Sequence, residues 1–374
     1  MTALVHDVGS GASVSAVTAA AYTVPTDAPE ADGTFAWDST TIVIVNASAA
    51  GATGVGYTYG PAALVGLVSA LLEPAVRGRD VFAVPASAEA MSRVLRNAGQ
   101  PGAGAYAASA VDCALWDLAA RLAGLPLHTF LGAARAEVPV YGSGGFTSYT
   151  DRQMTEQLAG WVAQDIPRVK IKIGQDRGSR EARDVERMIL AREAIGAGPE
   201  LFVDANGAYT PKQAVRVAEA ARETRFAWFE EPVSSEDPAG LRFVRERVAA
   251  DVAAGEYLTR LADAERMCAA GAVDCLQADV TRCGGITVWL RVAAVAAAHG
   301  VGFSGHCAPA ISAAPAAAAP SLRHLEWFHD HVRLESMLFD GTPDPRGGTI
   351  TPCPDAPGNG LTLRTTDAES FRVA

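Results

Sequence analysis

The chain lacks the features that would direct a protein to a nucleic acid or into a membrane. No cluster of lysine and arginine offsets its formal net charge of −11, so we expect neither a nucleic acid nor an anionic membrane surface as its main partner. Residues 286–300 form an apolar stretch, but Arg291 interrupts it. With no run of about 18 apolar residues, the sequence predicts no membrane-spanning helix.

Cysteines are few and show no metal-binding or redox spacing. None of them forms a CxxC pair, and a chain of 374 residues has no need of disulfide bonds to fold. Residues 1–17 contain no lysine or arginine, and glycine and serine interrupt their apolar residues, so we expect no signal peptide. These absences predict a cytoplasmic protein with reduced thiols. The six cysteines are Cys113, Cys268, Cys275, Cys283, Cys307 and Cys353.

Three carboxylates recur along the chain at an interval of 26 residues: Asp204, Glu230 and Glu256. Each follows a short apolar run, and the segments between them repeat apolar residues at helical spacing, which indicates β/α units. The carboxyl ends of the strands in a parallel barrel share one rim, so the three acids should converge there. Each acid taken alone could instead cap the helix that follows its strand, but capping does not require even spacing.

Convergent carboxylates repel one another unless a cation lies between them. Hard oxygen ligands that leave room for water and substrate suit Mg²⁺, whereas zinc prefers nitrogen and sulfur. The three acids therefore predict a Mg²⁺ site at the rim.

Strands and helices alternate regularly from residue 138 onward. Strands that alternate with helices of about 10 to 15 residues imply a parallel sheet, and eight such strands close a barrel. We predict a TIM-like (β/α)7β barrel over residues 131–328. Its eight strands are expected at VPVYGSGG (138–145), VKIKIG (169–174), LFVDANG (201–207), FAWFEEP (226–232), VAAGEY (252–257), CLQADV (275–280), VGFSGH (301–306) and HLEWF (324–328).

The first 130 residues should form an α+β capping domain. Residues 13–59 read as three strands with glycine turns, followed by helices at about 61–75, 86–98 and 106–123. The polar segment at about 25–40 carries Phe35 and Trp37; it is either an ordinary surface loop or a lid over the rim. Residues 329–374 lack the alternation and should pack back on the capping domain.

Lys170 and Lys172 lie two positions apart near the end of the second barrel strand, so both should face the inside of the barrel. Two neighbouring ammonium groups depress each other's pKa, and a lysine affected in this way can serve as a base near neutral pH. The alternative is a surface strand with solvated lysines, which requires the flanking Val169, Ile171 and Ile173 to be the buried face.

Three further polar residues fall at strand ends. Asp279 ends the sixth strand and His306 the seventh, so the two should meet, and the carboxylate would orient the imidazole and raise its basicity. Glu326 lies in the eighth strand between Leu325 and Trp327 and should face the same centre.

These residues resemble the enolase superfamily and, within it, the mandelate racemase subgroup. The resemblance covers nearly the whole chain, and Asp279 separates it from the related muconate cycloisomerase subgroup, which has a lysine there. It implies that Lys172 is a base tuned by Lys170, and that Asp279 and His306 form a dyad acting on the opposite face of the substrate. It further implies that Mg²⁺ is bound by Asp204, Glu230 and Glu256. Glu326 would donate a hydrogen bond to the substrate carboxylate, and Asn206 would be a polar residue beside the first metal ligand.

The resemblance implies abstraction of the proton α to a carboxylate, and a homo-oligomer that acts on a small-molecule carboxylate. We expect dehydration of a sugar acid or a related hydroxy acid; a racemase or epimerase of a 2-hydroxy or amino acid derivative is the alternative. A metal-dependent hydrolase is disfavoured, because it would require several histidines at strand ends. A protein that uses the barrel only to bind a ligand is also disfavoured, because its rim would have lost the catalytic residues. Arg282 and Cys307 are further rim positions, with Cys307 expected to point away from His306 as a packing thiol.

Overall fold

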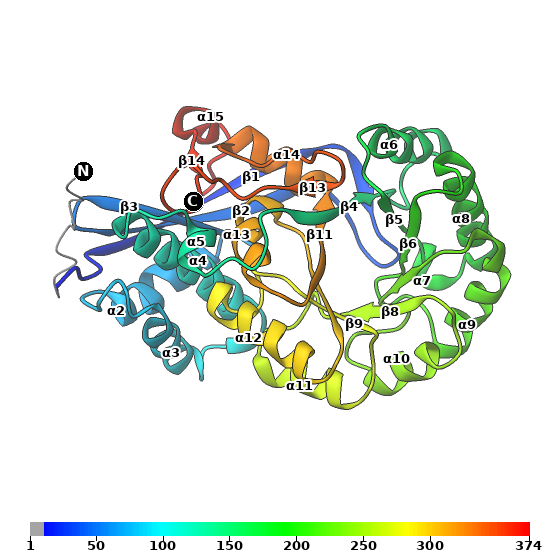
Figure 1. The fold of residues 1–374 in the computed structure, drawn as a ribbon, viewed down its shortest axis with the longest axis horizontal. Coiled ribbons are helices and arrows are strands. Elements are labelled where there is room, and N and C mark those ends of the chain that lie inside the picture. Colours follow the sequence, from blue (N-terminus) through cyan, green and yellow to red (C-terminus); the bar gives the residue numbers. More distant parts are fainter. Residues whose placement is uncertain (1–10) are drawn as a thin grey trace.

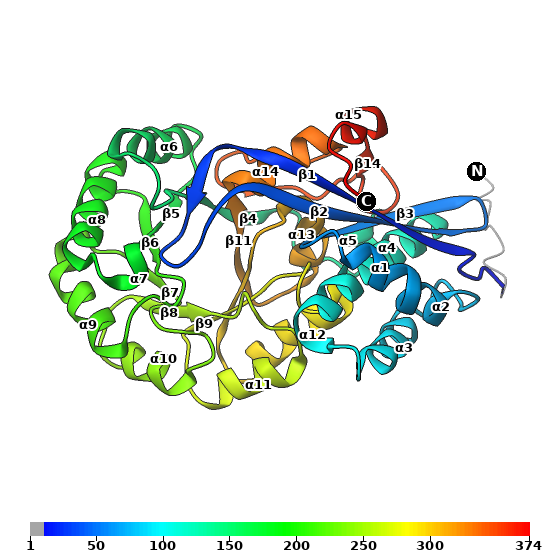
Figure 2. The same ribbon diagram turned by 180° about the vertical axis from the view of Figure 1, so that it is seen from behind.

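The computed structural model describes residues 11–374. The expectation of no signal peptide in residues 1–17 rests mainly on residues outside this range. Among the described residues, no helix is both long and apolar enough to cross a membrane. A three-stranded sheet with its helices occupies one end of the molecule and a barrel the other, and the long β1–β2 hairpin extends from the first part to the second (Figures 1 and 2).

The barrel has the predicted eight parallel strands. They pair in chain order from β4 to β11, and β11 pairs with β4 to close the ring. A short additional strand, β13 (Thr349–Ile350), pairs antiparallel with β4. The barrel strands are β4 (Val138–Gly144), β5 (Arg168–Lys172), β6 (Glu200–Asp204), β7 (Trp228–Glu230), β8 (Asp251–Ala254), β9 (Cys275–Ala278), β10 (Gly302–Gly305) and β11 (Leu322–Phe328).

Helices surround the barrel on its outside (Figure 1). Two of them, α6 and α9, begin with a capping box in which Thr150 or Thr210 exchanges hydrogen bonds with a glutamine three residues later. The helices that follow the strands are α6 (Asp151–Ala163), α7 (Gln175–Gly178), α8 (Glu181–Ile195), α9 (Pro211–Ala220), the 3₁₀ turn Arg222–Thr224, α10 (Pro238–Arg245), α11 (Leu261–Ala269), α12 (Gly285–Ala298) and α13 (Pro309–Ala318).

Period-two alternation builds an apolar floor beneath a polar rim inside the barrel. Tyr141, Phe202 and Trp228 are buried there, with Phe202 and Trp228 stacked at a centroid distance of 5.2 Å. Two positions further along β6 and β7, the same face presents Asp204 and Glu230. The aromatic side chains therefore support the level at which the acids lie.

The capping domain contains the expected three antiparallel strands and a long helix packed on them. Gly54 and Gly56 of β3 allow this contact, because a Cβ at either position would lie 2.3 or 2.2 Å from backbone atoms of α4. The elements are β1 (Ala16–Ala31), β2 (Ala36–Ala49), β3 (Ala52–Tyr59), α1 (Leu64–Leu67), the π-helical Val68–Leu72, α2 (Glu73–Val76), α3 (Val84–Leu95), the irregular turn Gln100–Gly104, α4 (Ala105–Leu122) and α5 (Leu127–Phe130).

The segment at 25–40 is not an irregular loop, contrary to the expectation. It belongs almost entirely to the β1–β2 hairpin, whose strands leave only residues 32–35 as the turn. The pairing register shifts between Pro25 and Glu30, which lets the strand accommodate its prolines. The hairpin contacts the loops after β4 and β5 through Thr147 N to Ala31 O (2.8 Å) and Arg177 N to Gly33 O (2.9 Å).

The end of the chain contacts β1. Ala21 N donates to Ala374 O at 2.9 Å, and Thr23 N donates to Phe371 O at 2.8 Å. The C-terminal segment thus lies against the capping sheet as well as the barrel. Its elements are α14 (His329–Leu338), β12 (Phe339–Asp340), β14 (Thr362–Leu363) and α15 (Thr365–Glu369).

Candidate active site

The three evenly spaced carboxylates meet at the rim. Asp204 and Glu230 end β6 and β7 in register with each other, and Glu256 lies two residues beyond β8. All three are buried, and one oxygen of each lies within 4.8 Å of the others. Burial and the charge of Asp204 raise the pKa of Glu230 to about 8, although Lys170 lowers it.

This donor set suits a hard divalent cation. It offers carboxylate oxygens, which Mg²⁺ prefers, and Asn206 beside it has a buried side-chain oxygen with no hydrogen-bond partner within residues 11–374. Asn206 N donates to Asp204 Oδ1 at 2.9 Å, which orients this carboxylate. The residues present therefore fit Mg²⁺.

Both rim lysines face the inside of the barrel, as predicted, but their pKa values move in the opposite direction from the prediction. Lys170 Nζ lies 2.8 Å from Glu326 Oε1 and also contacts Glu230, while Lys172 Nζ contacts Asp204. Burial lowers the pKa of each lysine, but the carboxylates outweigh it and raise both above the ordinary value. Lys170 does lower the pKa of Lys172, as expected, but the prediction of a lowered net pKa is wrong, because the neighbouring carboxylates raise it by more.

His306 and Asp279 meet as predicted. Asp279 also accepts hydrogen bonds from Thr281 N (2.7 Å) and Thr281 Oγ1 (2.6 Å), which fix its carboxylate. His306 Nε2 lies 3.1 Å from Glu256 Oε2 and 3.4 Å from Glu326 Oε2. Burial lowers the pKa of His306, but Cys307, Glu256 and Glu326 raise it well above its usual range.

Glu326 lies in β11 and is held by its neighbours as an acceptor. It receives hydrogen bonds from Ser143 Oγ (2.6 Å) and Cys307 N (3.1 Å). Burial raises its pKa, but Lys170 and His306 lower it below the ordinary value. The carboxyl group is therefore ionised among these side chains.

Cys307 does not point away from His306. It follows the end of β10 with φ 50°, so strand alternation does not apply to it. Its Sγ lies 3.3 Å from both His306 Nε2 and Glu326 Oε2. Burial and Glu326 raise the pKa of the thiol, so it is protonated and unsuited to be a nucleophile.

A cavity of about 500 Å³ opens over these residues. Lys172, His306 and Cys307 line it from the barrel, and Phe35 and Trp37 line it from the hairpin. The hairpin therefore forms one wall of the site. The cavity is further lined by Asp32, Ser39, Thr40, Thr41, Tyr59, Gly60, Pro61, Asn206, Glu256, Tyr257, Arg282, Phe328 and His331.

Two charged residues beside the site, Arg282 and Glu231, had no role predicted from the sequence. Arg282 lies 3.3 Å from Glu256 Oε1 and 3.4 Å from Asp279 Oδ2, so it links a candidate metal ligand to the dyad. Glu231, 2% exposed, is the second acid of WFEEP, and burial and Glu256 raise its pKa well above the usual range. The doubled acid was the available signal for Glu231, whereas nothing in the sequence paired Arg282 with two strands.

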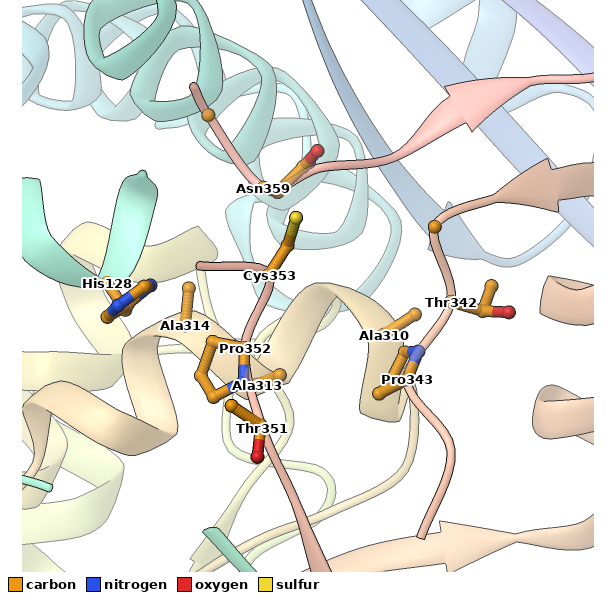
Figure 3. Close-up of a pocket in the computed structure, with 12 residues that line it drawn as sticks. His128, Ala310, Ala313, Ala314, Thr342, Pro343, Thr351, Pro352, Cys353 and Asn359 are labelled. Carbon is orange, nitrogen blue, oxygen red and sulfur yellow. The ribbon is translucent and has the colours of Figure 1, made fainter. Parts of the chain in front are cut away.

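A second cavity, of about 190 Å³, lies between α5, α13 and the C-terminal segment (Figure 3). It is lined by His128, by alanines of α13 and by Cys353 and Asn359. The residues that line this cavity include no aspartate or glutamate, so it offers no carboxylate to hold a metal ion.

The chain belongs to the enolase superfamily, in its mandelate racemase subgroup. Residues 153–368 match the family described as enolase C-terminal domain-like, and residues 16–132 match the mandelate racemase / muconate lactonizing enzyme N-terminal domain. The chain is therefore an enzyme of this superfamily.

Of three similar proteins, one is named as a racemase and one as a dehydratase. A mandelate racemase/muconate lactonizing enzyme-like protein from Rubrobacter xylanophilus is 53% identical, with a TM-score of 0.93 over 96% of this chain and 100% of that one. A racemase from Streptomyces coelicolor A3(2) with bound magnesium is 28% identical, with a TM-score of 0.89 over 96% and 100%. The L-talarate/galactarate dehydratase of Salmonella typhimurium is 33% identical over 65% of this chain, a match that spans 61% of the dehydratase.

Proposed function

We propose that this enzyme uses Mg²⁺ to abstract the proton α to a carboxylate and dehydrates a sugar acid or a related hydroxy acid. One observation carries the proposal: Lys172 contacts Asp204 and His306 contacts Glu256, so two proton-transferring groups flank the carboxylate triad from two strands. The similarity to L-talarate/galactarate dehydratase supports a sugar acid as substrate class.

Asp204, Glu230 and Glu256 would hold the metal. When bound, Mg²⁺ supplies positive charge that stabilises the negative charge developing on the substrate carboxylate as its α-proton leaves. Metal binding would also relieve the repulsion among the three acids. Asn206 would orient Asp204 and contact the substrate beside it.

The other roles follow from the contacts of each side chain. Lys172 and His306 would remove the α-proton and assist the departure of the β-hydroxyl group as water. Lys170 would keep positive charge beside Glu326. A bound substrate carboxylate would raise the pKa of Glu326, so that Glu326 would donate a hydrogen bond to the far oxygen of that carboxylate. Asp279 keeps the hydrogen of His306 on Nδ1 and so leaves Nε2 free to exchange protons.

Residues 1–130 would act as the capping domain, 131–328 as the catalytic barrel and 329–374 as the segment that joins them. Residues 25–40 of the β1–β2 hairpin would cover the substrate and exclude water, because Phe35 and Trp37 already line the cavity.

Racemisation or epimerisation is the second candidate. It is favoured by the same placement of Lys172 and His306 on different strands, because each could then serve one face of the α-carbon. The similarity to the Streptomyces coelicolor racemase also supports it.

The test is a library of sugar acids and 2-hydroxy acids incubated with the Mg²⁺-loaded enzyme in D₂O. Release of a 2-keto product scores dehydration, and deuterium at the α-carbon scores proton abstraction. We expect both with at least one sugar acid and neither with neutral sugars. Interconversion of stereoisomers without any keto product would replace the dehydratase by the racemase, and turnover of a substrate that has no carboxylate would refute both.

A further inference from the structure

A second group of metal-binding side chains lies away from the rim, where the hairpin meets α14. It consists of Asp27 and Glu30 of β1 and His329, the first residue of α14. One ligand atom from each lies within 4.8 Å of the others. Asp27 Oδ2 is 2.9 Å from His329 Nε2, although 302 residues separate them in the chain.

The environment of Glu30 provides a second observation that points to a bound ligand. The residue is 1% exposed, and its Oε2 accepts a hydrogen bond from Trp37 Nε1 at 2.8 Å. Its Oε1 is buried and has no hydrogen-bond partner among residues 11–374. A buried carboxylate oxygen is rarely left without a partner, so a group that binds oxygen is expected there.

The surrounding charges favour a cation. Asp330 is buried beside the group, but Thr40 Oγ1 (2.5 Å) and Arg333 Nη2 (2.7 Å) occupy its two oxygens. Asp330 is therefore paired with Arg333, whereas no lysine or arginine among residues 11–374 forms an ion pair with Asp27 or Glu30.

We infer that Asp27, Glu30 and His329 form a second divalent-cation site, separate from the rim, that ties the hairpin to α14. One imidazole nitrogen and two carboxylates suit Zn²⁺ or Mn²⁺, whereas Mg²⁺ prefers oxygen alone. Three protein ligands leave positions for water, and the partly exposed Asp27 and His329 provide an entry path. Trp37, by holding Glu30 Oε2, directs Oε1 toward the ion.

Occupation of the site would act on the cavity through Trp37. The Trp37 ring lines the cavity and its N–H binds Glu30, so an ion that fixes Glu30 also fixes this wall. The hairpin would then be held over the rim. The ion has no part in the proton transfers, so the inference is independent of the proposed reaction.

The test counts bound Zn²⁺ per chain by equilibrium dialysis and elemental analysis, with the enzyme kept in excess Mg²⁺. Wild type is compared with Glu30→Gln and His329→Gln. Glu30→Gln keeps the size of the side chain and an acceptor for Trp37. His299→Gln is the matched control, because His299 also pairs with a carboxylate, Glu265 at 2.9 Å, but no third ligand lies beside this pair in the described part of the chain.

We expect wild type and His299→Gln to bind one more Zn²⁺ per chain than either site variant. This difference does not depend on whether Zn²⁺ also binds at the rim, because the rim is the same in all four proteins. Chymotrypsin cleavage at Phe35, which is 67% exposed, should become at least about tenfold slower with Zn²⁺ in wild type and stay unchanged in Glu30→Gln. Equal stoichiometry in wild type and Glu30→Gln overturns the inference. The library experiment measures Mg²⁺-dependent turnover separately, so a failure of this inference can be told apart from a failure of the proposed reaction.

Discussion

His306 Nδ1 lies 2.8 Å from Asp279 Oδ2, across the neighbouring strand ends of β9 and β10. Burial raises the pKa of Asp279, but the hydrogen bond from His306 and the charge of Arg282 keep it below the ordinary value. The carboxylate is therefore ionised and accepts the Nδ1 hydrogen, which leaves Nε2 as the nitrogen that faces the cavity.

Asp279→Asn should lower kcat by about 10² to 10⁴-fold, the range for loss of general acid–base function, because an amide can stabilise the wrong tautomer of His306. KM should change little, since Asp279 does not line the cavity. Thr281→Val is the control: it removes one hydrogen bond to Asp279 while Thr281 N keeps the other, so its loss should be much smaller. Equal losses in both variants would contradict an orienting role for Asp279.

Removal of the metal should abolish activity and lower thermal stability together. Three buried carboxylates gain a counter-charge when Mg²⁺ binds, so the melting temperature should rise with Mg²⁺ concentration, with a gain in stability of about 2.7 kcal/mol at 100 times Kd. Asp204→Asn and Glu230→Gln should lose both the activity and the Mg²⁺-dependent shift, measured by calorimetry. Full activity of both variants in a chelator would show that the triad is not a metal site.

Lys172→Ala and His306→Asn should each reduce dehydration by about 10² to 10⁴-fold. Because the two groups lie on different strands, we expect one variant still to exchange the α-proton in D₂O. The residue missing from that variant is then the acid that assists the leaving hydroxyl. Near-wild-type turnover in both variants would exclude both residues from the chemistry.

Stability should fall as the pH rises toward 8 because of Glu335. This buried acid accepts hydrogen bonds from Tyr57 OH (2.5 Å) and Ala310 N (3.1 Å), and burial raises its pKa from 4.5 to about 8. The unfolded chain therefore loses this proton first, so the contribution is complete below pH 4.5 and is lost as the pH rises through about 8.

Glu335→Gln cannot ionise and should show a smaller loss of stability between pH 5 and 8. The measurement is the midpoint of urea unfolding at each pH. Glu89→Gln, an exposed acid of α3, is the control and should keep the wild-type slope. Parallel curves for wild type and Glu335→Gln would refute the assignment.

Gly56→Ala should destabilise the capping domain by about 1 to 3 kcal/mol, the usual effect of overpacking. Its Cβ would lie 2.2 Å from Ala110 O. The control is Gly66→Ala in α1, where a Cβ meets no atom within 4 Å; it should be stabilising by about 0.5 to 1 kcal/mol through helix propensity. Denaturant unfolding measures both, and a neutral Gly56→Ala would contradict the close approach of β3 and α4.

The barrel and the rim acids could be predicted from the sequence because both depend on local regularities. Side chains alternate between the two faces of a strand, so the position of an acid at the end of a strand indicates which face it occupies. Eight successive β/α units allow few topologies. The electrostatics of Lys170 and Lys172 could not be predicted in the same way. Their pKa values depend on carboxylates from β6, β7 and β11, whose distances exist only in the folded barrel.

Three other features could not be predicted from the sequence, for related reasons. The position of Cys307 depends on a positive φ just beyond a strand, and alternation carries no information there. The hairpin at 25–40 was read as a loop because its prolines and acids disfavour a regular strand, whereas a register shift accommodates them. The group around Glu30 is assembled from segments at opposite ends of the chain, which no local pattern connects.

The burial of two lysines in the rim has a practical consequence for attaching the enzyme to a support. The 374 residues contain three lysines, and Lys170 and Lys172 are 0% and 5% exposed and protonated among carboxylates. Lys212, at the start of α9, is the exposed one. Among the lysine side chains, an amine-selective crosslinker should therefore modify Lys212, so that immobilised molecules keep the lysines of the rim unmodified.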